Sequence, residues 1–288
     1  MRILLLGGDG MLGHQVLRCL SDGHEVRVTL RQPIDTYRAF NLFSGGNAID
    51  LVDARDARRV DQVIRAFAPQ AVVNCIGIVK QRHQAKAAIP SLEINSLLPH
   101  RVLETCADIG ARLIHFSTDC VFSGRGSAYR EGDEPDPLDL YGRTKLLGEV
   151  EDAPGLTLRT SIIGLELSRK TGLIEWFLAQ RGTIRGFQRA IYTGLTTLEM
   201  ARLVRRLIEG HPDLHGVWHV ASEPITKYDL LVRLSAKLGR SDVTILPDVD
   251  FVCDRSLNAE RFAAATGYVA PGWEEMLTEL AEDIERRR

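Results

Sequence analysis

The sequence predicts an α/β fold in which a doubly wound parallel sheet is followed by a smaller C-terminal lobe. Short, almost entirely apolar runs alternate with helical patterns through the first half of the 288 residues. A glycine-rich turn follows the first run directly, and after about residue 160 the alternation loosens. Continuous apolar runs are typical of parallel strands buried on both faces, and such sheets bind ligands at the carboxyl ends of their strands. We therefore expect a Rossmann-type sheet with its ligands at that edge.

The first strand is expected at residues 2–6 and leads into a glycine-rich turn and an apolar-periodic helix. The turn reads Gly7-Gly8-Asp9-Gly10-Met11-Leu12-Gly13. Glycines at positions 7, 10 and 13 allow a tight turn, a close approach to a pyrophosphate and the packing of helix on strand, while the helix start offers N–H groups to phosphate. Gly7 and residues 9–13 are therefore candidate cofactor contacts; a merely structural turn is the alternative.

The second strand, residues 24–30, ends where a dinucleotide fold places an acidic residue on the adenosine ribose. Arg31 stands there instead and can hold the 2′-phosphate of NADP; a solvated surface arginine is the alternative. Residues 33–47 read as a loop before a short strand that ends near Asp53. Asp53 is a candidate partner of the adenine amino group, or else the N-cap of a helix over residues 55–67.

Two further strands bring polar and small residues to the same edge of the sheet. The strand at residues 70–77 ends in Cys75-Ile76-Gly77, where Gly77 is small enough to let a cofactor pass. A helix from about Ser91 to Asp108 carries Asn95, and the next strand covers residues 111–116. The segment Ser117-Thr118-Asp119 then falls at a carboxyl end, where ligands are expected.

A tyrosine and a lysine four residues apart form the most chemically informative pair. Asp139 is an expected N-cap, so that a helix begins at Tyr141, includes Lys145 and continues toward Val150. The spacing places both side chains on one face, and a nearby ammonium favours the tyrosinate and lowers the tyrosine pKa. Such a pair can act as an acid and base, although on its own the pattern also occurs by chance on exposed helices.

Taken together, these motifs resemble an extended short-chain dehydrogenase/reductase, most of all the dTDP-4-dehydrorhamnose reductase group. Weaker traces, among them Asn95-x-x-x-Pro99 and Leu158-Arg159-Thr160-Ser161, extend the resemblance over nearly the whole chain. The principal motifs are Gly7-x-x-Gly10-x-x-Gly13, Ser117-Thr118-Asp119-Cys120-Val121-Phe122 and Tyr141-Gly142-Arg143-Thr144-Lys145-Leu146-Leu147-Gly148-Glu149.

The resemblance implies a reductase of a nucleotide-linked 4-keto-sugar in deoxysugar or surface-polysaccharide precursor biosynthesis. Tyr141 would exchange a proton with the sugar oxygen, Lys145 would bind the nicotinamide ribose and lower the tyrosine pKa, and Thr118 would hydrogen-bond the same oxygen. NADPH is the expected cofactor, on the strength of Arg31, with NADH as the alternative. The implied cofactor contacts are Gly7, Asp9, Gly10, Met11, Leu12, Gly13, Arg31, Asp53, Cys75, Ile76, Gly77, Asn95, Tyr141 and Lys145.

The expected substrate contacts are Asp119, Cys120, Trp176 and Arg255. Arg255 resembles the late arginine that pairs with a sugar-nucleotide pyrophosphate, with a surface ion pair as the alternative. Trp176 lies in a short amphipathic helix, residues 174–178, whose aromatics are more often core than ligand contacts. Cys120 departs from the rhamnose reductases, which carry tyrosine there, so the exact sugar stays open.

Two other functions remain open. A nucleotide-sugar 4-epimerase uses the same tyrosine and lysine but retains its NAD, and a non-catalytic NADP-binding regulatory subunit would share the fold. A 4,6-dehydratase is disfavoured, because those relatives carry glutamate at the position of Cys120 and a thiol in apolar surroundings yields little thiolate base.

The second half is expected to be interleaved. We expect an NAD(P)-binding domain over residues 1–160, to which later elements at about 185–221 return, and a mainly substrate-binding lobe over residues 161–288. Helices are expected at residues 198–208 and 227–238, a strand at 218–221, and a final amphipathic helix after Trp273.

Composition excludes several classes of partner. Lys and Arg number 36 against 38 Asp and Glu, so there is no net field to attract nucleic acid or an anionic membrane. No apolar run reaches the length of a membrane span, the five cysteines are scattered, and the spacing of His211, His215 and His219 is broken by Pro212 and Gly216. We expect a cytoplasmic protein without a metal site, and we leave a homodimer open.

Overall fold

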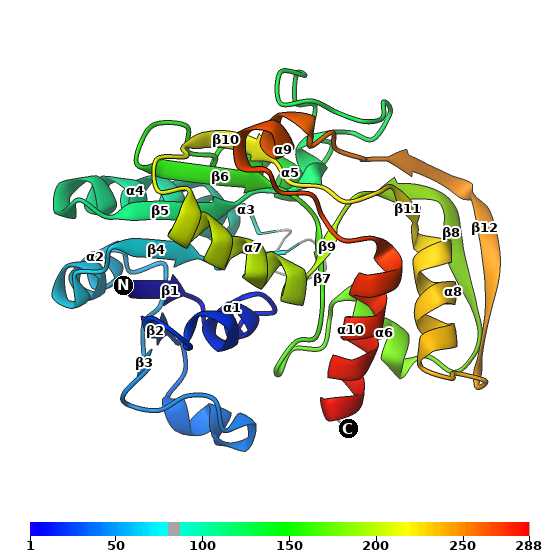
Figure 1. Cartoon of the computed structure of the whole chain (residues 1–288), viewed down its shortest axis with the longest axis horizontal. Helices are drawn as coiled ribbons and strands as arrows, with labels where there is room; N and C mark the ends of the chain where they lie inside the picture. The colour runs from blue at the N-terminus through cyan, green and yellow to red at the C-terminus, as the bar shows by residue number, and fades with distance from the viewer. Residues whose placement is uncertain (80–86, 288) are drawn as a thin grey trace.

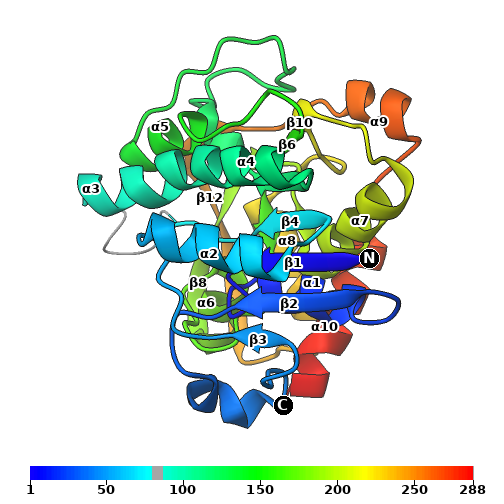
Figure 2. The ribbon, with the colours of Figure 1, turned by 90° about the vertical axis from the view of Figure 1, so that its left-hand side faces the viewer.

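A seven-stranded sheet in which all neighbours are parallel forms the larger part of the molecule. The computed structural model describes residues 1–79 and 87–287. The strands are, in spatial order, β10 (Gly216–His219), β6 (Gly155–Arg159), β5 (Arg112–Phe116), β4 (Ala71–Asn74), β1 (Arg2–Leu6), β2 (Glu25–Thr29) and β3 (Ala48–Ile49). The strands β2 and β3 are added on one side of β1, and β4, β5, β6 and β10 on the other. Ligands of such sheets bind at the switch point between β1 and β4. The expected Rossmann-type sheet is confirmed (Figures 1 and 2).

Helices cover both faces of this sheet. One face packs on α1 (Gly13–Leu20) and α7 (Thr197–Gly210), and the other packs on α2 (Ala57–Phe67) and α4 (Leu98–Ile109). The central strands are buried on both sides, as near-continuous apolar runs require: Ile3 and Leu5 face the first core, while Leu4 and Leu6 face the second.

A smaller sheet forms the second lobe (Figure 1). In it β8 (Gly182–Tyr192) lies between β11 (Ile225–Thr226), which is antiparallel, and β12 (Val243–Asp254), which is parallel. Its packing and connecting elements are α6 (Leu173–Ala179), β7 (Ile162–Ile163), β9 (Leu195–Thr196), α8 (Lys227–Lys237), α9 (Glu260–Thr266) and α10 (Trp273–Arg287). The strands β8 and β12 were not predicted. Most of their side chains are solvent-exposed, β8 has no regular apolar alternation, and the alternation in β12 is interrupted by Pro247.

Several boundaries differ from the predicted ones. The predicted loop at residues 33–47 contains a 3₁₀ helix, η1 (Ile34–Phe40). The predicted strand toward Asp53 ends already at Ile49. The helix expected from Ser91 begins earlier, as α3 (Ala88–Ser91), and passes through a π-helical segment, η3 (Leu92–Leu97), before α4.

The helix that carries the tyrosine and lysine is shorter than predicted. It is α5 (Leu140–Leu146), capped as expected by Asp139, whose side chain accepts from the Gly142 N–H. It does not continue to Val150, because Gly148 lies against η3, and a Cβ atom there would come within 1.9 Å of the Asn95 carbonyl oxygen. Within residues 1–79 and 87–287, no helix combines the length and apolar character needed to cross a bilayer.

Candidate active site

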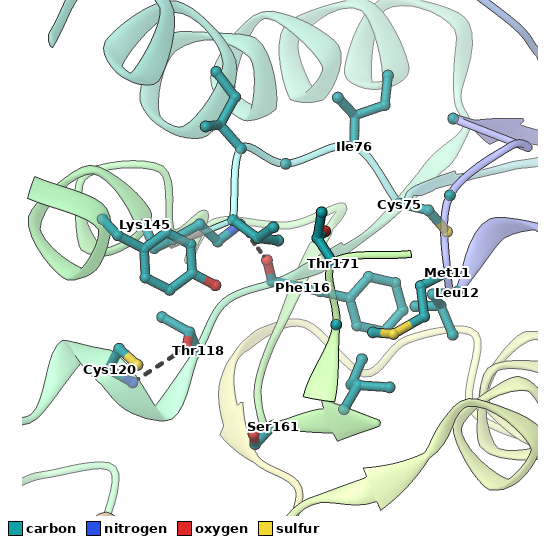
Figure 3. Close-up of a pocket in the computed structure, with 18 of the residues that line it drawn as sticks. Met11, Leu12, Cys75, Ile76, Phe116, Thr118, Cys120, Lys145, Ser161 and Thr171 are labelled. Carbon is teal, nitrogen blue, oxygen red and sulfur yellow. Dashed lines mark hydrogen bonds between the residues drawn. The ribbon is translucent and has the colours of Figure 1, made fainter. Parts of the chain in front are cut away.

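A cavity of about 720 Å³ lies at the carboxyl edge of the large sheet and reaches elements of the second lobe. It follows the ends of β1, β4 and β5, the strands that flank the switch point. Figure 3 shows Met11, Leu12, Cys75 and Ile76 on one side of Phe116, with Thr118 and Cys120 on the other. The sequence-predicted residues that line it are Gly7, Asp9, Gly10, Met11, Leu12, Arg31, Asp53, Cys75, Ile76, Gly77, Thr118, Asp119, Cys120, Tyr141, Lys145 and Arg255.

The glycine turn forms one end of the cavity. Gly7 has a φ of 84°, in the left-handed region that favours glycine, and its N–H donates to Thr29 Oγ1 at 3.0 Å. A Cβ atom at Gly13 would lie 2.1 Å from the Gly7 carbonyl oxygen, so only glycine fits between β1 and α1. No side chain in the described residues caps the start of α1, which leaves its N–H groups for a phosphate.

The end of the cavity where the sequence predicts the adenosine contains a carboxylate and two arginines. Asp53 forms an ion pair with Arg55 at 2.6 Å and also accepts from the Arg55 backbone N–H, and these contacts hold the pKa of Asp53 below its ordinary value. Asp53 does not cap the following helix: α2 begins at Ala57, and its cap is Asp56. Arg31 is exposed and lines the cavity together with Arg55. The sequence did not predict Arg55, because its pairing with Asp53 depends on the conformation of the turn after β3.

Asp9 joins the glycine turn to the second lobe. Its Oδ2 accepts from the Tyr37 hydroxyl at 2.9 Å and from Arg169 Nη2 at 3.1 Å. Tyr37 comes from η1, in the segment predicted to be a loop, and Arg169 from the segment before α6. Neither was predicted, because both lie far from Asp9 in the sequence. The buried Asp9 carboxylate therefore links the glycine turn to η1 and to the segment before α6.

Lys145 is buried beneath the cavity floor. Its ammonium donates to the Phe116 carbonyl oxygen at 2.5 Å, as Figure 3 shows, and lies 3.4 Å from His115 Nε2. The other ring nitrogen of His115 lies 3.2 Å from Asn74 Nδ2. Burial lowers the pKa of Lys145 to about 8, opposed by the charge of Glu149. The lysine is thus fixed at the end of β5, with a proton that it can lose near neutral pH.

Tyr141 does not have the lowered pKa that the sequence predicts. Burial raises the pKa of its phenol above the ordinary value, and the neighbouring Cys120 and Asp119 add to this, while a hydrogen bond with Thr118 opposes it. The reason is that desolvation of the buried phenol is the largest effect and outweighs the hydrogen bond that favours the tyrosinate. In this chain Tyr141 is therefore a protonated phenol at neutral pH.

Thr118 and its two successors form a connected polar corner. The Thr118 hydroxyl donates to Asp119 Oδ1 at 3.1 Å and accepts from the Cys120 N–H at 3.2 Å (Figure 3). Burial raises the pKa of the Asp119 carboxyl, and it raises that of the Cys120 thiol to about 12. The thiol therefore stays protonated at neutral pH and is a poor base, as expected from apolar surroundings.

Arg255 faces the corner from β12's end rather than pairing with a surface acid. Its Nε donates to the Phe122 carbonyl oxygen at 2.8 Å, and its Nη1 lies 3.4 Å from Cys120 Sγ. Lys227, the first residue of α8, lines the same part of the cavity. Sequence reasoning missed Lys227, because only the lobe packing brings α8 to this edge.

Three predicted site residues do not line the cavity. Gly13 lies behind the turn, and Trp176 is 40 % exposed on α6. Asn95 is buried in η3, where it accepts from the Ile78 N–H at 2.9 Å and donates to Thr144 Oγ1 at 3.2 Å. Asn95 thus ties the loop after β4 to α5. In the described parts of the chain, no three His, Cys, Asp or Glu side chains gather as metal ligands would.

Comparison with known proteins gives consistent similarities. The model of a family described as RmlD substrate binding domain matches residues 1–285. The chain is 28 % identical over 259 residues to a probable low-salt glycan biosynthesis reductase, Agl14, of Haloferax volcanii, covering 85 % of this chain and 83 % of that protein. It is 30 % identical over 270 residues to the methionine adenosyltransferase 2 subunit beta of Danio rerio, covering 85 % of this chain and 76 % of that protein.

Solved structures share the fold. A dTDP-4-dehydrorhamnose reductase of Bacillus anthracis in complex with NADP superposes with a TM-score of 0.79 at 20 % identity, covering 98 % of this chain and 99 % of that one. A UDP-glucose 4-epimerase of Thermus thermophilus in complex with NAD has a TM-score of 0.78 at 20 % identity, covering 99 % of each. The same architecture thus accommodates either dinucleotide.

Proposed function

Since the chain belongs to the RmlD substrate-binding domain family, we propose that it is an NADPH-preferring reductase of a nucleotide-linked 4-keto-sugar. The observation that carries the proposal is that Thr118, Tyr141 and Lys145 meet at the cavity that also contains the glycine turn. A proton donor, a second hydrogen-bonding hydroxyl and a buried ammonium suit the charge that develops on a ketone oxygen during reduction. The similarity to the probable glycan biosynthesis reductase Agl14 supports it.

The residues of the cavity fit a nicotinamide dinucleotide. The turn at Gly7 and Gly10 is bare backbone, since a Cβ at Gly10 would lie 3.2 Å from the Gly7 carbonyl oxygen, and the N-terminus of α1 points to the same end. When bound there, the cofactor supplies the hydride. Tyr141 gives its phenolic proton to the ketone oxygen, and the Thr118 hydroxyl turns from Asp119 to hydrogen-bond that oxygen. Lys145 holds the positive charge that stabilises the tyrosinate left behind.

The protonation of Lys145 predicts how activity depends on pH. The ammonium is present below its pKa of about 8 and is lost above it, because burial disfavours the charged form. We therefore expect kcat/KM for NADPH, which reports the free enzyme, to fall as the pH rises through about 8. Tyr141 stays protonated over this range. A profile that is flat from pH 7 to 9 would contradict the role given to Lys145.

The two arginines at the adenosine end predict the cofactor preference. We expect Arg31→Ala to lower kcat/KM for NADPH about tenfold or more, the cost of one charge-assisted hydrogen bond, while NADH is nearly unaffected. Arg58→Ala, an exposed position on α2, is the matched control and should change neither value. If the ratio of kcat/KM for NADPH to kcat/KM for NADH were unchanged in Arg31→Ala, Arg31 would not belong to the 2′-phosphate site.

One experiment separates reduction from the alternatives. The purified protein is given dTDP- and UDP-linked 4-keto-sugars with NADPH deuterated at the transferred position. A reductase oxidises one NADPH for each sugar and leaves deuterium on the former carbonyl carbon. Tightly held NAD⁺ and sugar interconversion without label would instead indicate an epimerase. The subunit beta relatives give a third outcome: no turnover on the panel, together with a co-purifying enzyme, would favour a subunit role.

A further inference from the structure

The hydroxyl of Tyr192 is a buried polar group that the fold leaves without a partner. Tyr192 ends β8, and its ring packs on Trp273 with centroids 5.7 Å apart. Its side chain is 5 % exposed, and its hydroxyl makes no hydrogen bond to any described residue. A buried hydroxyl without a partner costs free energy, so its retention requires a reason.

The position of Tyr192 supplies that reason. The described residues contain three other buried side-chain atoms without partners, which are Arg27 Nε, Ser91 Oγ and Arg112 Nε. None of those three residues lines the cavity, whereas Tyr192 does. Its unsatisfied hydroxyl is therefore the one among them that a ligand in the cavity can satisfy.

A carboxylate accompanies this hydroxyl. Asp119 is buried and lines the same cavity, and burial raises the pKa of the Tyr192 phenol, an effect to which the nearby Asp119 carboxyl adds. Asp119 Oδ1 already accepts from Thr118, and its carboxylate has further acceptor capacity. A hydrogen-bond donor from β8 and an acceptor from the β5 edge thus both line the cavity. A sugar hydroxyl, which both accepts and donates, matches this pair.

We propose that Tyr192 and Asp119 together bind one hydroxyl of the sugar, with Tyr192 donating to its oxygen and Asp119 accepting its proton. This rests on the reductase function proposed above. The Thr118 hydroxyl, proposed above to contact the ketone oxygen, lies 3.1 Å from Asp119 Oδ1, so we assign the bound hydroxyl to the carbon next to the carbonyl. Tyr192 is then a specificity-determining residue that selects sugars with a free hydroxyl at that carbon.

The experiment compares two tyrosine variants. Tyr192→Phe keeps the ring on Trp273 and is expected to lower kcat/KM for the keto-sugar nucleotide about 10- to 100-fold through KM, with NADPH binding unchanged and Tm unchanged or raised. Tyr268→Phe is the matched control: its buried hydroxyl donates to Glu199 at 2.8 Å, and Tyr268 does not line the cavity. That variant should lower Tm and leave the kinetics intact.

A substrate analogue completes the test. A nucleotide sugar that lacks the hydroxyl next to the carbonyl should be a poorer substrate for the wild type by a similar factor, but should lose little more with Tyr192→Phe. Unchanged kcat/KM in an active Tyr192→Phe protein, or equal discrimination against the analogue by both proteins, would overturn the assignment of Tyr192. Failure of the wild type to reduce any 4-keto-sugar nucleotide would overturn the reductase function itself, and this inference with it.

Discussion

Tyr141→Phe is expected to lower turnover about 10²- to 10⁴-fold, the range for loss of a positioned general acid. The phenylalanine ring keeps the partly buried contacts of the wild-type ring, so NADPH should bind almost as before. Only the phenolic proton is removed, and the raised pKa of Tyr141 means that this proton is present throughout the neutral range. Single-turnover hydride transfer, measured beside a fluorescence titration of NADPH, separates the chemical step from binding.

The control for this variant lies on the same helix. Arg143 is exposed, and Arg143→Ala removes a long side chain from α5 without touching the cavity lining. Its turnover should stay within about twofold of the wild type, a difference below 1 kcal/mol. If Tyr141→Phe also turned over within that margin at an unchanged Tm, Tyr141 could not be the proton donor.

The large sheet was predictable because each strand carries its own signal. Residues 2–6 and 112–116 are mostly apolar and almost wholly buried, and the side chains that follow them reach one edge by the parallel topology alone. That is why the glycine turn, Cys75 and Thr118 could be assigned to a common site before their distances were known. Strands β8 and β12 lacked such a signal, since β12 is an edge strand with Pro247 and a register shift between Asp248 and Val252.

Properties that depend on tertiary surroundings could not be predicted from local spacing. The four-residue separation places Tyr141 and Lys145 on one helix face, but the Phe116 carbonyl oxygen that engages the lysine comes from β5. Desolvation then reverses the expected direction of the tyrosine pKa shift. In the same way, Lys227 and Tyr192 line the cavity only through the packing of the second lobe. Trp176, which the amphipathic pattern of its helix favours as a core residue, is partly exposed to solvent instead.

Arg159→Met is expected to lower the free energy of unfolding by about 3–5 kcal/mol, the usual cost of leaving a buried charge without its partner. Arg159 Nε and Nη2 donate to the two oxygens of Glu149 at 2.8 and 2.7 Å, and both side chains are buried. In the described part of the chain, the further hydrogen bond to that carboxylate comes from the Ser117 hydroxyl, at 2.6 Å, which carries no charge to neutralise it. Urea unfolding at pH 7 measures the loss.

Two further variants test whether the unpaired charge is the cause. Removing both charges in Arg159→Met/Glu149→Leu should recover much of the stability, because well-packed apolar residues can replace a buried ion pair at little cost. Arg205→Met breaks the exposed pair with Glu209 on α7, at 2.9 Å, and should cost less than about 1 kcal/mol. A double variant as unstable as Arg159→Met would show that packing, and not the unpaired Glu149, sets the loss.

Since Ser117 directly precedes Thr118, we expect the single variant to lose turnover as well, through a displaced hydroxyl, and the double variant to regain part of it.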